Sequence, residues 1–260
     1  MFGFKKRRRK KLRSTELKNE WKKIINKNVK FYSYLPEDLK TELHGLVQIF
    51  MYEKIFEGCG GLEITDEIKI TIAAQACLLL LGRETDIYPA LRTILVYPHT
   101  YFAPVKRKME DGTVVEGTEP RLGESWSRGQ VVLAWDEIVQ DTQDIHDGHN
   151  LILHEFAHQL DNESGAAEGI PEFDKRSSYI VWARVITKEY NRLINDIIHH
   201  KHPLLDKYGA ENPAEFFSVV TEYFFEKPAE LKKLHPELYE RLKDFYMLDT
   251  ADIIPQNAKT

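Results

Sequence analysis

Two histidines and a glutamate lie close together in the chain, at a spacing that suits metal chemistry. The segment Leu151–Asp161 has the sequence LILHEFAHQLD, in which His154, Glu155 and His158 form the pattern His-Glu-x-x-His. Residues four apart lie one turn apart on the same face of a helix, so both imidazoles can reach one ion. Glu155 lies about 100° around the helix from His154. Its carboxylate can therefore take a proton from a water that the metal activates.

The neighbours of these three residues predict that the helix is buried. They are apolar: Leu151, Ile152, Leu153, Phe156, Ala157 and Leu160. The alternative is that the histidines are core groups satisfied by ordinary hydrogen bonds. Three polar side chains on one apolar helix are costly to bury without a shared partner, however, and a metal ion supplies one. We therefore predict a zinc site that holds one Zn²⁺ per chain.

A catalytic zinc site needs a third protein ligand and leaves its fourth position to water. The segment Tyr208–Phe217 (YGAENPAEFF) offers one. Its Asn-Pro pair predicts a helix start with Pro213 at the first position and Glu215 in the first turn, beside two phenylalanines. Two other carboxylates compete for this role. Glu211 precedes the helix and is expected to be exposed, whereas Glu222 lies two turns beyond Glu215 on about the same face.

The remaining segments predict an α+β fold that positions these residues. Residues 92–102 and 130–135 are rich in β-branched and aromatic side chains and predict strands of a small sheet. Helices are expected over residues 17–28 and 37–57, over a buried apolar run at 70–81, and over most of the chain after residue 179. We expect one domain over residues 17–250, with an active-site helix, a mostly helical C-terminal half and a tail at 251–260.

The first residues of the chain are strongly basic. Residues 5–13 (KKRRRKKLR) carry 8 basic groups and no acid, so a net charge of −5 for the chain leaves −13 on the rest. Residues 1–13 have no apolar periodicity and no acid to pair with, so residues 1–16 are predicted to be a disordered head. The alternative is a weak contact of residues 5–13 with an anionic surface. The acidic remainder predicts no specific nucleic-acid binding.

Neither the cysteines nor the apolar segments indicate export. The chain has 2 cysteines, Cys59 and Cys77, at no metal-binding or paired spacing, which predicts reduced thiols. The longest apolar run, Ile70–Leu81, is too short for a transmembrane helix, which needs about 20 residues. No cleavable signal follows the basic residues. We therefore expect a cytoplasmic protein with no transmembrane segment.

Several segments together resemble the Mlc titration factor A family of bacterial zinc-dependent peptidases, also described as anti-repressors of a glucose-uptake regulator. LHEFAHQLD is preceded by GQVVLAWDEI and DGHN and followed by YGAENPAEFF and EYFF. The resemblance runs from about Trp21 to Asp249. That family is similar in structure to the catalytic domain of anthrax lethal factor. The resemblance thus implies a zincin-like metallopeptidase domain.

The resemblance also implies roles for individual residues. It makes Glu215 the third zinc ligand and Tyr208 a hydrogen-bond donor to the oxygen that becomes negative during hydrolysis. The alternative for Tyr208 is a core tyrosine. Asp161 and Glu222 are expected to lie behind the ligands, with Asp161 fixing the tautomer of a ligand imidazole. The alternative for Asp161 is a surface position at the end of the helix.

Two functions follow from this sequence. In the first, the protein hydrolyses a peptide or protein substrate, as an aminopeptidase or an endopeptidase. Glu155 then acts as base and afterwards as acid, and Gln130–Trp135 is the edge strand along which an extended substrate lies. In the second, a non-catalytic zinc protein sequesters a transcriptional repressor of sugar uptake. The two are not exclusive.

Overall fold

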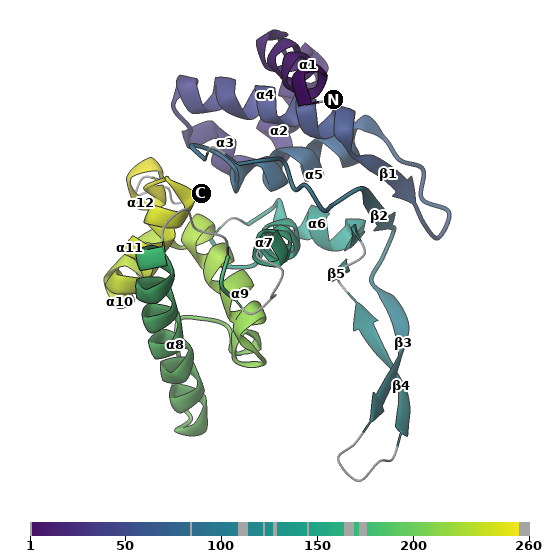
Figure 1. Ribbon diagram of the computed structural model, residues 1–260. Coiled ribbons are helices and arrows are strands. Elements are labelled where there is room, and N and C mark those ends of the chain that lie inside the picture. Colours follow the sequence, from purple (N-terminus) through teal and green to yellow (C-terminus); the bar gives the residue numbers. More distant parts are fainter. Residues whose placement is uncertain are drawn as a thin grey trace.

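The computed structural model describes residues 2–83, 85–108, 114–121, 123–126, 129–144, 146–163, 169–171 and 176–254. Its helices are α1 (Phe2–Ser14), α2 (Asn19–Asn28), α3 (Lys30–Tyr34), α4 (Glu37–Glu53), α5 (Asp66–Leu78), α6 (Trp135–Asp141), α7 (Leu151–Glu163), α8 (Arg176–Ile198), the 3-10 helix η1 (Lys207–Ala210), α9 (Pro213–Glu226), α10 (Pro228–Leu234), α11 (Pro236–Tyr246) and α12 (Thr250–Ile253). Its strands are β1 (Ile55–Gly58), β2 (Thr93–Tyr97), β3 (Tyr101–Lys108), β4 (Val114–Arg121), β5 (Gly123–Trp126) and β6 (Gln130–Ala134). The predicted mixed fold, with a small sheet and a helical C-terminal half, is confirmed (Figure 1).

Four strands form one sheet in the order β1-β2-β6-β5. Strands β1, β2 and β6 are parallel, and β5 is antiparallel to β6. Residues 131–134 of β6 are all buried, which is typical of a strand covered on both faces of a sheet. Strands β3 and β4 pair with each other as a separate antiparallel hairpin that extends away from the helices (Figure 1).

The prediction that Gln130–Trp135 is an edge strand is wrong. This segment forms β6, which lies between β2 and β5, and Trp135 already belongs to α6. The edge strand next to β6 is β5, and β1 forms the opposite edge of the sheet. The sequence of β5, GESW, contains no β-branched residue. Backbone pairing places β5 in register with β6, from Gly123 opposite Leu133 to Trp126 opposite Gln130. Composition alone does not reveal this strand, because Trp126 is its only residue of a type that is enriched in strands.

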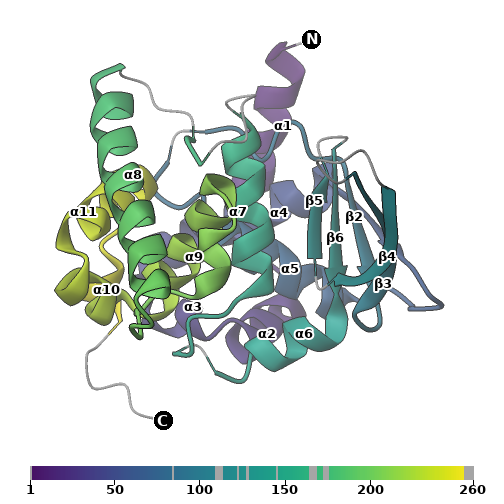
Figure 2. The ribbon, with the colours of Figure 1, turned by 90° about the horizontal axis from the view of Figure 1, so that it is seen from below.

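The helix α7 lies at the centre of the molecule. It packs against α9 on one side, against β5 and β6 on another, and against α5 (Figure 2). Helix α5 is buried on nearly every side, as its apolar sequence predicts, and almost all of its residues from Ile68 to Leu78 belong to the core. The polar residues of α7 are thus held between helices and sheet that are themselves well packed.

The expectation of a disordered basic head is wrong. Residues 2–14 form α1, which packs against α4 (Figure 1). Arg9 makes two hydrogen bonds to the carboxylate of Glu53, at 2.8 Å and 2.6 Å, and also contacts Asp86. Lys5 binds Asp86 at 3.2 Å, and Leu12 packs on the core. The acids that pair with the head come from distant parts of the chain, so a search for acids within the head could not find them.

The predicted domain boundary at residue 250 is also too early. Thr250 donates a hydrogen bond to the carbonyl of Phe224 at 2.6 Å, and Ile254 is buried. The domain therefore includes α12, and only residues 255–260 of the predicted tail lie outside the described part of the chain. Among the described residues no helix is long and apolar enough to cross a membrane.

Candidate metal centre

The start of α7 is fixed by a network of side chains. The Oδ1 atom of Asn150 accepts a hydrogen bond from the backbone of Leu153 at 3.0 Å, which caps the helix. Its amide nitrogen donates to Gln75 at 2.8 Å and to Glu226 at 3.1 Å. Asp141 accepts the backbone N–H of Leu151 at 2.8 Å. These bonds set the rotation of α7 and hence the direction in which its histidines point.

The turn before α7 needs a glycine. Gly148 has φ +83°, and a Cβ atom there would lie 2.8 Å from Cζ of Tyr223. Its N–H donates to the carboxylate of Glu226 at 3.2 Å. Hydrogen bonds from Gly148 and Asn150 to Glu226 and Glu222 connect this turn to α9. The functional importance of Asn150 was missed, although its place directly before an apolar helix was a signal for a cap.

The start of α9 is the helix start predicted from the Asn-Pro pair. Asn212 accepts hydrogen bonds from the backbone N–H groups of Ala214 and Glu215, at 2.9 Å and 3.0 Å, and Pro213 occupies the first turn. The cap therefore holds the backbone of Glu215 itself. Glu211 is exposed, as predicted.

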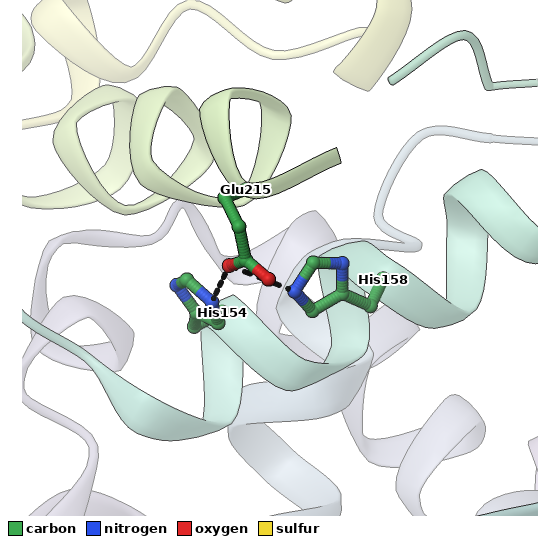
Figure 3. Close-up of side chains that lie close together, drawn as sticks. All are labelled: His154, His158 and Glu215. Carbon is green, nitrogen blue, oxygen red and sulfur yellow. Dashed lines mark hydrogen bonds and ion pairs between the residues drawn. The ribbon is translucent and has the colours of Figure 1, made fainter. Parts of the chain in front are cut away.

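Three of the predicted residues converge on one point. Glu215 reaches from α9 toward the imidazoles of His154 and His158 on α7 (Figure 3). Its Oε2 atom lies 3.0 Å from Nε2 of His154 and 3.3 Å from Nε2 of His158. One ligand atom from each residue lies within 4.8 Å of the others. The side chains are only 12%, 15% and 17% exposed, so the cluster is largely shielded from water.

The second carboxylate of α9 lies behind the cluster. Oε1 of Glu222 lies 2.7 Å from Nδ1 of His154, which donates to it. Its Oε2 atom accepts the backbone N–H of Asn150 at 2.7 Å. Glu222 therefore leaves Nε2 of His154 as the nitrogen that faces His158 and Glu215. A carboxylate in this position orients a ligand imidazole and makes it a stronger base.

The charges of the cluster depend on one another. Burial alone would raise the pKa of Glu215, but hydrogen bonds from His154 and His158 lower it to about 2. Burial disfavours the charged form of His154, yet the carboxylates of Glu222 and Glu215 raise its pKa well above the usual value. Glu215 and His154 thus stabilise each other's charged forms. A metal ion at this point would be a positive partner for Glu215 and would compete with protons for the imidazoles.

The residues of the cluster fit a zinc ion. Two imidazole nitrogens and one carboxylate oxygen are a ligand set that zinc takes in catalytic sites, with one position left over. All three groups approach each other from two helices whose starts are capped, so little rearrangement is needed to bind an ion. His154, His158 and Glu215 would hold it.

Glu155 and Tyr208 both lie near His154. Glu155 is 5% exposed, and its negative charge contributes to the raised pKa of His154. The ring centroid of Tyr208 lies 5.8 Å from that of His154. Tyr208 belongs to η1, where Asp206 accepts its backbone N–H at 2.7 Å. With 47% of its surface exposed, Tyr208 is not a core tyrosine, and its side chain is accessible at the side of the cluster.

Asp161 is buried, which excludes the alternative of a surface position. Its two carboxylate oxygens accept the backbone N–H groups of Gly169 and Ile170, each at 2.8 Å. Gly169 has φ +72°, and a Cβ atom there would lie 2.3 Å from the carbonyl oxygen of Pro213. Asp161 therefore holds the chain after α7 against the first residue of α9, close to Glu215. Its predicted role in fixing an imidazole tautomer stays a prediction.

The sequence profile of the family described as glucose-regulated metallo-peptidase M90 matches residues 4–247. The chain belongs to this family. The match extends from α1 to the end of α11, so the basic head is part of the region that the family profile covers. A metallopeptidase family implies a metal ion, in agreement with the cluster of two histidines and one glutamate.

Individual relatives cover most of the chain. The protein slr2042 of Synechocystis sp. is 42% identical over 244 residues, which are 93% of this chain and 88% of that protein. Mlc titration factor A of Pectobacterium atrosepticum is 32% identical over 218 residues, 83% of this chain and 81% of its own. Mlc titration factor A of Klebsiella pneumoniae is 32% identical over 215 residues, 80% of each chain. The predicted resemblance to Mlc titration factor A is confirmed, and that to anthrax lethal factor stays a prediction.

Proposed function

We propose that this protein is a zinc-dependent peptidase whose ligands are His154, His158 and Glu215. The observation that carries the proposal is the convergence of these three side chains beside the buried carboxylate of Glu155. When bound, zinc lowers the pKa of a water to near neutrality and polarises the carbonyl of the substrate. The chain's own residues supply the remaining requirements of hydrolysis.

Glu155 is the general base in this proposal. It takes the proton from the attacking water and passes it to the amine that leaves, a role that suits a buried carboxylate next to the ligands. Tyr208 donates a hydrogen bond from its phenol to the carbonyl oxygen as that oxygen becomes negative. Glu222 keeps His154 in one orientation through its bond to Nδ1.

The substrate would lie along β5. This strand pairs with β6 on one side, and no described strand pairs with its other side. It also packs against α7, so a peptide added to the free edge would run past the metal centre. When a peptide adds to a sheet as a strand, its backbone N–H and C=O groups form hydrogen bonds whatever its side chains are. This mode of binding therefore suits a peptidase that accepts protein segments.

A second function is binding of a transcriptional repressor. It is favoured by the relatives named Mlc titration factor A, a name that describes titration of the repressor Mlc. Binding of a repressor does not need Glu155 as a base. The two functions are therefore separated by the Glu155→Gln variant, which keeps the volume and the three ligands.

The test combines metal analysis with an assay on fluorescent peptides, with and without a chelator. We expect one zinc per chain in the wild type and in Glu155→Gln. Hydrolysis should need the metal and should fall in the variant by about 10²–10⁴-fold, the usual contribution of a general base. Turnover of Glu155→Gln close to that of the wild type would exclude this mechanism. Absence of zinc from the wild type would exclude the site.

A further inference from the structure

Helix α1 is attached to the protein by one face. Arg9 and Lys5 pair with Glu53 and Asp86, and Leu12 packs on the core. On the same side, a Cβ atom at Gly45 of α4 would lie 3.1 Å from the side chain of Arg13. On the attached face of α1, the charges of Lys5 and Arg9 are therefore paired with carboxylates, and the packing is close.

The opposite face of α1 carries positive charge without a counter-charge. Lys6, Arg7, Lys10 and Lys11 are exposed, and within the described part of the chain their side chains make no hydrogen bond or ion pair. At 100° per residue, these four cations and Phe4 occupy an arc of about 160° on one side of the helix. We call these five residues the outer face of α1.

Aromatic side chains mark one end of this surface. Phe4 is 81% exposed, and Arg8, one turn further along, lies 4.7 Å from the ring centroid of Tyr52. Tyr52 is 56% exposed, and Ile55, just after α4, is 57% exposed. An exposed phenylalanine among lysines and arginines is typical of helices that lie in the headgroup region of a membrane. The cations meet the anionic headgroups there, and the aromatic ring enters the apolar boundary.

We propose that the outer face of α1 docks the protein onto a membrane surface rich in anionic phospholipid. The acidic remainder of the chain, at −13, would be repelled by such a surface, so the protein would bind through α1 alone. Helices α4 and α5 lie between α1 and α7 (Figure 1). Docking therefore leaves the metal centre on the side away from the membrane, accessible to a protein substrate or partner.

The experiment is co-sedimentation of the full chain with vesicles. Vesicles of phosphatidylcholine with 30% phosphatidylserine should bind the wild type in 50 mM NaCl, whereas vesicles of pure phosphatidylcholine should bind at least ten times more weakly. Raising NaCl to 300 mM should reduce binding to the anionic vesicles at least ten-fold, because small ions screen the attraction. Equal binding to both kinds of vesicle would overturn the proposal.

Two triple variants with the same change of charge locate the surface. The first variant changes three lysines of α1 to Gln, namely Lys6, Lys10 and Lys11. The control variant changes three exposed lysines elsewhere to Gln, namely Lys23, Lys30 and Lys233. Thermal unfolding shows whether each is folded. The first should lose at least ten-fold in binding to anionic vesicles and the control less than two-fold. Equal losses would show that net charge, not α1, decides binding.

Phe4→Ser tests whether the aromatic ring inserts into the membrane, and binding of the wild type to a duplex oligonucleotide tests nucleic acid as the alternative ligand. It should weaken binding to anionic vesicles three-fold or more without changing thermal stability, since the side chain is exposed. A wild type that binds a duplex oligonucleotide tightly but no anionic vesicle would overturn the proposal in favour of nucleic acid.

Discussion

The Nδ1 atom of His154 lies 2.7 Å from the Oε1 atom of Glu222, on the side of the imidazole that faces away from Glu215. One helix, α9, therefore supplies carboxylates to both nitrogens of the same imidazole. Glu215 approaches the nitrogen that faces His158, and Glu222 approaches the nitrogen behind it. The two carboxylates of α9 that were candidates for the third ligand therefore have different roles.

Glu222→Gln should weaken zinc binding by about 10–100-fold, the usual cost of removing a carboxylate behind a ligand histidine. The amide of Gln offers one acceptor oxygen where Glu222 uses two, for His154 and for the backbone of Asn150. Competition with a chromophoric chelator measures the affinity. The control is Glu211→Gln, which removes an exposed carboxylate just before the same helix and should bind zinc like the wild type. Equal affinities in both variants would contradict the assignment.

Glu215→Ala should lose zinc at stoichiometric concentrations, because it removes one of the three ligands. Metal content of the purified variants, measured by elemental analysis, decides between the two carboxylates of α9. Glu215→Ala should contain less than a tenth of the zinc of the wild type, as should His154→Ala and His158→Ala. Full zinc in Glu215→Ala together with its loss in Glu222→Ala would show that Glu222 is the ligand.

Arg9→Ala should lower the free energy of unfolding by about 2 kcal/mol, because hydrogen bonds to a charged group contribute about 1.5–3 kcal/mol. The side chains of Arg9 and Glu53 are only 20% and 15% exposed, so water competes weakly for the hydrogen bonds between them. Urea denaturation of the metal-free protein measures the effect. Arg7→Ala, on the outer face of the same helix, is the matched control and should change the free energy of unfolding by less than 0.5 kcal/mol, as surface substitutions usually do. Equal stability of the two variants would show that the contact of Arg9 with Glu53 does not stabilise the fold.

The titration of Asp141 should make the free energy of unfolding depend on pH between about 4 and 7. Burial raises the pKa of this carboxyl to about 7, although the N–H of Leu151 lowers it. The unfolded chain has a pKa near 3.9. The folded protein therefore binds more protons between these values, and the contribution of Asp141 to stability falls as pH rises from about 4 to 7.

The side chain of Asn in Asp141→Asn does not titrate, and it keeps an oxygen that can accept the backbone N–H of Leu151. The variant should therefore lack the loss of stability that Asp141 causes as pH rises. Relative to the wild type, the variant should gain stability as pH rises from 4 to 7, by up to about 4 kcal/mol. Urea denaturation at several pH values, in the presence of a chelator, measures the difference. Asp144→Asn, at an exposed position, is the control and should follow the wild type at every pH. A constant difference between Asp141→Asn and the wild type would contradict the raised pKa.

The sequence by itself determined the local features of the site. The spacing of His154 and His158 puts both on one helical face, and the Asn-Pro pair at 212–213 places Glu215 in a first turn. Both follow from interactions between residues at most four apart, namely the helical repeat and the cap. The burial of α5 followed in the same way from a run of apolar residues.

Only the tertiary structure decided which distant groups meet. Spacing alone left Glu211, Glu215 and Glu222 as alternatives for the third ligand. Glu215 and Glu222 took different places only because α9 packs on α7, where each faces a different nitrogen of His154. The ordering of α1 depends on Glu53, 44 residues away from Arg9, and the edge position of β5 depends on backbone pairing with β6. Contacts of this kind form between segments far apart in the chain, and local propensity and charge counts contain no information about them.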